Sequence, residues 1–211
     1  MSVDRRRRVV LIEDHAAIRT GLALLLDSEG FAVVGEAGDA DSGYETIARE
    51  RPDVVLLDVG LPGESGVSLA RRLLRRDSRL GILLYTGAED PAVLSAVLDC
   101  GARGFAHKAA PLHETVRAVR AVAAGGSYID PRGAQIISES APRHPERVLS
   151  LREREVMTLV AEGCSRQGLS DRLSISEETA RTHVRNAMRK LEVHTRAQAV
   201  IVALKRGEIT V

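Results

Sequence analysis

The sequence predicts a doubly wound α/β domain with a five-stranded parallel sheet, followed by a small all-α domain. Two observations predict this fold class. From residue 8 to about residue 124, short apolar runs alternate with segments of helical periodicity, as in parallel strands joined by helices. Beyond about residue 150 the strand pattern disappears and only helical periodicity remains. A chain of 211 residues is long enough to form both domains.

Five apolar runs supply the expected strands. Each run is short and rich in aliphatic residues, which is typical of strands that are buried on both faces of a sheet. In chain order the runs are VVLIE at 9–13, FAVVGEA at 31–37, VVLLD at 54–58, GILLYT at 81–86 and GFAHK at 104–108.

Segments with helical spacing separate these runs. Ile18, Leu22 and Leu25 recur on one face of the first segment, and the later segments show similar spacing. The last of these helices is expected to begin near Pro111, because proline is favoured in the first turn of a helix. It is expected to stop at Gly125, because glycine commonly follows a helix end.

A linker is predicted between a first domain at residues 1–124 and a second at residues 148–211. This linker, residues 125–147, contains three prolines and several small polar residues, and a short helix is expected around 135–138. Helical patterns then cover roughly 151–162, 166–173, 177–191 and 195–206.

The charge is distributed unevenly between the two parts of the chain. Residues 1–147 hold 19 basic and 21 acidic residues, whereas residues 148–211 hold 11 basic and 8 acidic residues. The basic second part favours a polyanionic partner such as double-stranded DNA.

Three features bear on where the protein acts. The basic run RRRR at 5–8 precedes an apolar stretch that Glu13 ends, which is too short for the core of a signal peptide. No stretch approaches the length of a membrane-spanning helix. Cys100 and Cys164 lie far apart and have no metal-ligand or disulfide spacing. The sequence therefore predicts a cytoplasmic protein with reduced thiols and no membrane partner.

Polar residues follow four of the expected strands. Glu13 and Asp14 follow the first strand, and Asp58, Thr86 and Lys108 end the third, fourth and fifth. Ligands of doubly wound sheets bind beyond the carboxyl ends of the strands, so these side chains are expected to converge. Three clustered carboxylates repel one another unless a cation lies among them, and an oxygen-rich cluster of this kind suits Mg²⁺.

The lysine and the threonine add a positive charge and a hydroxyl group to this cluster. Together the groups could hold a small tetrahedral anion against Asp58, whose carboxylate could attack phosphorus to form an acyl phosphate. The sequence contains neither a GxxxxGK[ST] loop nor a GxGxxG turn, so nucleotide binding is poorly supported. His15 and His107 flank the site, and structural roles are favoured for both.

These elements resemble the receiver domain of two-component response regulators, a flavodoxin-like fold, over about residues 8–124. The resemblance rests on ED at 13–14, LLDVGLPGESG, LLYTG and GFAHK. It implies that Asp58 is the phospho-acceptor and that Lys108 pairs with the phosphoryl group. It also implies that Thr86 and Phe105 change position as the switch. The residues that it implies for Mg²⁺ are Glu13, Asp14, Asp58 and the Gly60 carbonyl.

Two positions depart from the usual pattern of that family. Phe105 replaces the commoner tyrosine, which removes a hydroxyl group from the expected switch. Gly60, two residues after Asp58, is smaller than the residue often found there. We expect this small residue to leave an acyl phosphate more open to water and therefore shorter lived.

The helix expected at 177–191 has two different faces. Its apolar face carries Ala180, Val184, Ala187, Met188 and Leu191 at helical spacing. Its other face carries several arginines, which suits the major groove of DNA and the flanking phosphates. A solvated charged helix with no DNA contact would show the same pattern.

The second domain resembles the helix-turn-helix of LuxR-type regulators over about residues 148–209. Leu151, Glu155, Gly163, the LSIS run and the RKLEV run carry this likeness. It implies DNA-binding roles for Thr179, Arg181, Thr182, His183, Arg185 and Arg189. It also implies dimerisation through the last helix, which carries Ala197, Val200, Ile201 and Leu204. Gly168 stands where this family usually has a glutamate that completes a capping box with Ser165.

Both resemblances together identify the sequence as similar to NarL/FixJ-type response regulators. They imply a non-enzymatic DNA-binding transcriptional regulator, phosphorylated on Asp58 by a histidine kinase with Mg²⁺, and a homodimer when active. Two alternatives stay open. One is an acyl-phosphate phosphohydrolase, which usually has a second aspartate where Gly60 stands. The other is a DNA-binding regulator controlled by a ligand or protein contact without phosphorylation.

Overall fold

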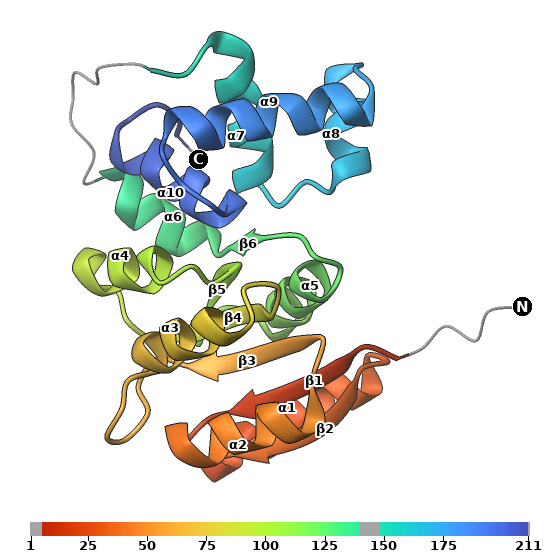
Figure 1. Cartoon of the computed structure of the whole chain (residues 1–211), viewed down its shortest axis with the longest axis vertical. Helices are drawn as coiled ribbons and strands as arrows, with labels where there is room; N and C mark the ends of the chain where they lie inside the picture. Colours follow the sequence, from red (N-terminus) through yellow and green to blue (C-terminus); the bar gives the residue numbers. More distant parts are fainter. Residues whose placement is uncertain (1–5, 140–147, 211) are drawn as a thin grey trace, which may run out of the picture.

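The computed structural model describes residues 6–139 and 148–210. They form a parallel sheet covered by helices, the α/β domain, and a group of helices stacked at one end of it, the helical domain (Figure 1). The predicted fold class, a doubly wound parallel sheet followed by a small all-helical domain, is therefore confirmed. Within these residues no helix has both the length and the apolar character needed to cross a membrane.

Among residues 6–139 and 148–210, the sheet has six parallel strands in the order β2-β1-β3-β4-β5-β6. The first five coincide with the apolar runs of the sequence. Their bounds are β1 Arg8–Ile12, β2 Ala32–Ala37, β3 Val54–Asp58, β4 Gly81–Thr86, β5 Gly104–His107 and β6 Tyr128–Ile129.

The prediction of five strands was wrong, because β6 lies within the predicted linker. Tyr128 pairs with Gly104, and Ile129 pairs with Phe105. A two-residue strand is too short to show periodicity, and its flanking glycines and Pro131 favour a turn. A helix follows at once, α6 Pro131–Glu139, longer than the one expected around 135–138. Residues 140–147 of the predicted linker lie outside the described residues.

In the part of the chain that the structure describes, five helices connect the strands and four more build the helical domain. For α5 and for the four helices of the helical domain, whose bounds the sequence predicted, the observed bounds lie within two residues of the expected ones. In the α/β domain they are α1 Ala16–Ser28, α2 Ala40–Glu50, α3 Gly66–Arg76, α4 Pro91–Asp99 and α5 Leu112–Ala123. In the helical domain they are α7 Leu151–Ala161, α8 Arg166–Leu173, α9 Glu177–Lys190 and α10 Arg196–Lys205.

Alternate residues of the strands enter two different cores. Val9 and Leu11 of β1 pack on the face that α1 and α5 cover, whereas Val10 and Ile12 pack on the opposite face with α2 and α3. This alternation follows from the two-residue repeat of a strand. It explains why these strands read as continuous apolar runs, since both faces of the sheet are buried.

The second of these cores continues into the helical domain. It includes Leu94 of α4 and Ile137 of α6, and it extends without interruption to Val200 and Leu204 of α10. In Figure 1, α6 lies between α4 below and α10 above, and each pair of these helices is in contact. The two domains are therefore joined by an apolar interface in this conformation.

Capping side chains begin the helices of the helical domain. Ser176 accepts a hydrogen bond from the Thr179 N–H at the start of α9. The turn before it is made by Ser174, which adopts a left-handed conformation with φ of 49°. α7 and α10 each have a complete capping box, whereas α8 has only the Ser165 half of one.

Candidate functional site

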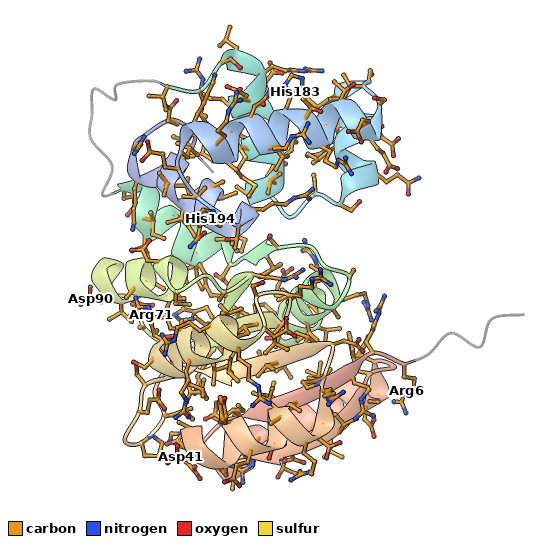
Figure 2. The ribbon with its side chains drawn as sticks, viewed as in Figure 1. Arg6, Asp41, Arg71, Asp90, His183 and His194 are labelled. Atoms are coloured by element: carbon orange, nitrogen blue, oxygen red, sulfur yellow. The ribbon has the colours of Figure 1, made fainter. Side chains whose placement is uncertain are left out.

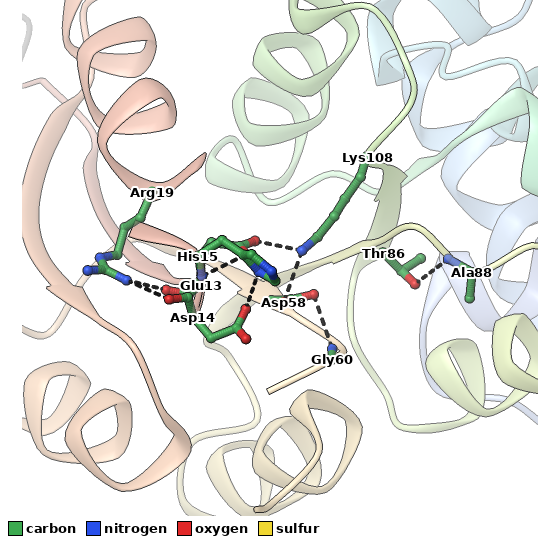
Figure 3. Close-up of polar contacts among 9 residues, drawn as sticks. All are labelled: Glu13, Asp14, His15, Arg19, Asp58, Gly60, Thr86, Ala88 and Lys108. Atoms are coloured by element: carbon green, nitrogen blue, oxygen red, sulfur yellow. Dashed lines mark hydrogen bonds and ion pairs between the residues drawn. The ribbon is translucent and has the colours of Figure 1, made fainter. Parts of the chain in front are cut away.

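The acidic residues lie where the strand order reverses. The chain passes from β1 outward to β2 and then returns to β3 on the other side of β1, so the ends of β1 and β3 flank a crevice. Glu13 and Asp14 follow β1, and Asp58 ends β3 (Figure 3). Glu13 is 2 % exposed and Asp58 is 3 % exposed, which is unusual for carboxylates and requires partners.

Lys108 links these two buried carboxylates. Its Nζ lies 2.8 Å from Glu13 Oε2 and 3.0 Å from Asp58 Oδ2 (Figure 3). Burial alone lowers the pKa of the lysine, but the hydrogen bonds and charges of Glu13 and Asp58 outweigh that effect and raise its pKa above the ordinary value. Lys108 is therefore a permanent cation beside Asp58.

Asp14 faces the more open side of the crevice with His15. The His15 Nδ1 lies 2.7 Å from Asp14 Oδ1 and 3.2 Å from Glu13 Oε1. Burial tends to raise the pKa of Asp14, but the hydrogen bond and charge of His15 lower it below its ordinary value. The same hydrogen bond raises the pKa of the exposed His15 ring. The sequence did not indicate this contact, because neighbouring residues in a loop have no fixed relative orientation.

Asp58 is also held from the loop that follows it. The Gly60 N–H donates a hydrogen bond of 3.1 Å to Asp58 Oδ1, so each oxygen of this carboxylate has a donor. A Cβ atom at position 60 would lie 3.8 Å from both carboxylate oxygens. The absence of a side chain at Gly60 therefore leaves this side of the carboxylate uncovered.

Thr86 is turned toward its own loop instead of toward the carboxylates. Its hydroxyl oxygen accepts a hydrogen bond of 3.0 Å from the Ala88 N–H (Figure 3). The side chain is 3 % exposed and sits at the end of β4, beside the strand that carries Asp58. The Thr86 side chain would have to break its hydrogen bond with the Ala88 N–H in order to contact an anion on Asp58.

Phe105 and His107 of β5 are both buried, at 0 % and 3 % exposure. The His107 Nδ1 accepts a hydrogen bond from the Ala109 N–H at 3.1 Å, while Lys108 turns to the carboxylates. This arrangement agrees with the structural role expected for His107. The Phe105 ring lies against α6, a contact that the sequence did not predict.

The residues of this crevice fit a divalent cation and a small anion. One ligand atom each from Glu13, Asp14 and His15 lies within 4.8 Å of the other two, so the carboxylates can share a hard cation such as Mg²⁺. Lys108 and the Gly60 N–H supply positive charge and a donor at Asp58. Together these groups could offset the charge that an acyl phosphate places on this carboxylate.

The arginine-rich face of α9 is accessible. Ala180, Val184 and Ala187 are buried, as the sequence predicted for its apolar face. His183 lies on the side of α9 far from the sheet, whereas His194 lies at the junction of the two domains (Figure 2). Of the residues expected to bind DNA, four are exposed and two are half-buried. The exposed ones are Thr179, Arg181, Arg185 and Arg189, and the half-buried ones are Thr182 and His183.

Comparison with known proteins assigns a family to each domain. Residues 9–120 match the response regulator receiver domain, and residues 147–203 match the luxR family of bacterial regulatory proteins. The chain is 30% identical to the transcriptional regulatory protein DegU of Brevibacillus brevis, over 99% of this chain and 97% of that protein. It is 34% identical to the response regulator GacA of Pseudomonas viridiflava, over 96% and 97%.

A solved structure of a related protein covers the same span. The structure of the two-component response regulator RcsB in complex with DNA aligns with a TM-score of 0.60 at 25% sequence identity. The alignment covers 95% of this chain and 99% of that one. The matches therefore extend over both domains.

Proposed function

Since the chain belongs to the NarL/FixJ-type response regulators, and is thus a DNA-binding transcriptional regulator of a two-component system, we propose that phosphorylation of Asp58 switches it. A partner histidine kinase is the expected phosphodonor. The single observation that carries the proposal is the pairing of the buried Asp58 with Lys108 at 3.0 Å, in a crevice that also holds Glu13 and Asp14.

The chemistry assigned to this site is the transfer of one phosphoryl group. An oxygen of Asp58 attacks phosphorus, and the new O–P bond forms as the P–N bond to the kinase histidine breaks. Lys108 neutralises charge on the phosphoryl oxygens, and Gly60 donates its N–H at the same carboxylate. The step modifies the protein itself and does not turn over an outside substrate, so the proposed role is that of a switch.

Mg²⁺ is the cofactor that the acidic crevice suits. Glu13, Asp14, Asp58 and the Gly60 carbonyl are the proposed ligands, and the bound ion would supply positive charge for the phosphoryl oxygens. Carboxylate and carbonyl oxygens are the ligand atoms that a hard cation prefers, and the carboxylates of Glu13 and Asp14 are clustered here.

The response to phosphorylation is assigned to Thr86 and Phe105. A phosphoryl group on Asp58 offers oxygens that can accept a hydrogen bond from the Thr86 hydroxyl group. In this structure the Thr86 hydroxyl oxygen accepts a hydrogen bond from the Ala88 N–H. Movement of Thr86 leaves space beside β5 for Phe105 to change its position. The two-state equilibrium of the α/β domain is thereby shifted toward the active form.

DNA binding is assigned to the exposed face of α9. Arg181, Thr182 and Arg185 are proposed to contact the DNA directly. Thr179, His183 and Arg189 are proposed to contact phosphates or to pack against neighbouring helices. The active form is proposed to be a homodimer on double-stranded DNA, with α10 as the contact in the helical domain. Because its target is DNA, the protein is expected to act in the cytoplasm.

The phosphodonor experiment separates this proposal from regulation without phosphorylation. The protein and its Asp58→Asn variant are incubated with Mg²⁺ and acetyl phosphate, and the intact mass is measured. We expect one phosphoryl group on the wild type and none on the variant. Equal labelling of the two proteins, or no labelling of either, would contradict the assignment.

A further inference from the structure

The contact between Phe105 and Gly133 is closer than any side chain at position 133 would allow. Phe105 is on β5 and Gly133 is on α6. A Cβ atom built on Gly133 would lie 2.2 Å from the ring Cζ of Phe105 and 2.4 Å from its Cε2. The tip of the buried ring therefore rests directly on the backbone of α6, and only glycine permits this approach.

The start of α6 is also hydrogen-bonded to β5. The Asp130 N–H donates to the Phe105 carbonyl at 3.1 Å, and Asp130 Oδ2 accepts from the His107 N–H at 3.3 Å. Asp130 Oδ1 accepts from the Arg132 N–H at 3.0 Å, which caps the first turn of α6. The first turn of α6 is thus positioned by the same strand that carries Phe105.

The other side of α6 holds the helical domain. α6 and α4 both contact α10, and Ile137 of α6 is buried in the core that includes Val200 and Leu204 (Figure 1). An ion pair of 3.6 Å between Lys205 of α10 and Asp99 of α4 lies at the same interface. In this conformation α10 is covered by the α/β domain, while the arginines of α9 are exposed.

We propose that α6 transmits the position of the Phe105 ring to α10, and that Gly133 is the positioning residue through which the ring contacts α6. While the tip of the ring rests against Gly133, α6 keeps its position and holds α10 against the α/β domain. A ring that moves, or a larger group at the contact, displaces α6 and releases α10. The inference rests on the proposed role of Phe105 as the residue that responds to phosphorylation.

This contact gives a physical reason for phenylalanine at position 105. A tyrosine hydroxyl would be attached to Cζ, the ring atom nearest to Gly133. It would crowd the backbone of α6 and would need a hydrogen-bond partner in an apolar core. Phenylalanine and glycine are therefore complementary at this contact, since each lacks the atom that would separate the two elements.

The test measures how far the domains separate in the full-length protein without a phosphodonor. The variants are Gly133→Ala and Phe105→Tyr, and the readout is the radius of gyration of the monomer by small-angle X-ray scattering. Gln135→Ala is the matched control, because Gln135 is exposed on the same helix and its amide donates a hydrogen bond to Glu139, away from the contact with Phe105. Circular dichroism verifies that each variant is folded.

Each of the two contact variants is expected to shift the ratio of separated to packed molecules by on the order of tenfold, and so to increase the radius. The control is expected to keep the wild-type radius. Combining Gly133→Ala with Phe105→Leu, which removes the ring atoms that clash, should restore the wild-type value. A contact with no role beyond local packing would lower stability without changing the radius.

The wild-type radius in either folded contact variant would overturn the inference, and so would an unrestored radius in the double variant. If one variant does not fold, the other still decides the question. Because no phosphodonor is used, the result is independent of the labelling of Asp58. Failure of the wild type to accept phosphate would contradict the proposed function, but it would not change the scattering result on the contact between Phe105 and α6.

Discussion

The substitution Gly168→Glu is predicted to stabilise the helical domain. Gly168 is the third residue of α8, and its N–H already donates a hydrogen bond of 3.1 Å to the hydroxyl oxygen of Ser165. The reciprocal bond, which Glu153 makes in α7, is absent from α8 because glycine has no side chain. A Cβ atom at position 168 would meet nothing closer than 3.4 Å, so a side chain fits without displacement of its neighbours.

The size of the effect follows from three contributions. Replacement of glycine within a helix gains about 0.5 kcal/mol or more from helix propensity. An acidic group in the first turn adds about 0.3 to 1 kcal/mol through the helix dipole. Completion of the capping box adds a hydrogen bond of about 0.5 kcal/mol. The expected gain in the free energy of unfolding is therefore about 1 to 2 kcal/mol.

Thermal unfolding of the fragment 148–211 measures this gain. For a domain of that size, 1 kcal/mol corresponds to about 4 to 8 °C in melting temperature. Gly168→Ala isolates the contribution of helix propensity, and Gly168→Gln adds the reciprocal hydrogen bond without the charge. A melting temperature of Gly168→Glu equal to that of Gly168→Ala would show that the box does not form. No rise in any of the three would refute the whole explanation.

Three further substitutions test other parts of the structure. Gly60→Met should lengthen the life of the acyl phosphate, because its Cβ would lie 3.8 Å from both oxygens of Asp58; equal dephosphorylation half-lives would refute this. Glu153 is buried, which tends to raise its pKa. Its ion pair of 2.7 Å with Lys190, the last residue of α9, and its hydrogen bonds with Ser150 outweigh burial and lower the pKa below the ordinary value. Its stabilisation is therefore complete above the unfolded-state pKa and is lost as the pH falls through the folded-state pKa, so Glu153→Gln should flatten the acid side of a stability-against-pH curve. Arg185→Ala should weaken DNA binding by about 1 to 3 kcal/mol if Arg185 contacts a base, or lower the salt dependence of the binding constant by about one phosphate contact if it contacts the backbone. Arg6→Ala removes the same charge outside the helical domain and serves as the control. Equal DNA binding by the two variants would count against the assignment.

The α/β fold could be predicted because its strands are buried on both faces. The run VVLLD at 54–58 became β3 with the same bounds. The placement of Asp58 beside Lys108 also followed, because the carboxyl ends of parallel strands meet at one edge of the sheet.

The junction between the domains could not be predicted in the same way. β6 has two residues, and two residues show no periodicity. The contact between Phe105 and Gly133 joins a strand to a helix in the predicted linker, and no local pattern specifies such a pair. The contact between the His15 ring and the Asp14 carboxylate also escaped prediction, because it depends on the geometry of the loop after β1.

The central claim is that Asp58 is the position at which this regulator is modified. Its most direct test is the intact mass of the protein after incubation with Mg²⁺ and acetyl phosphate, with Asp58→Asn treated in parallel. We predict a single phosphoryl group on the wild type, no labelling when Mg²⁺ is removed by a chelator, and none on the variant. A wild type that stays unmodified with Mg²⁺ present, or a variant that labels equally, would contradict the account.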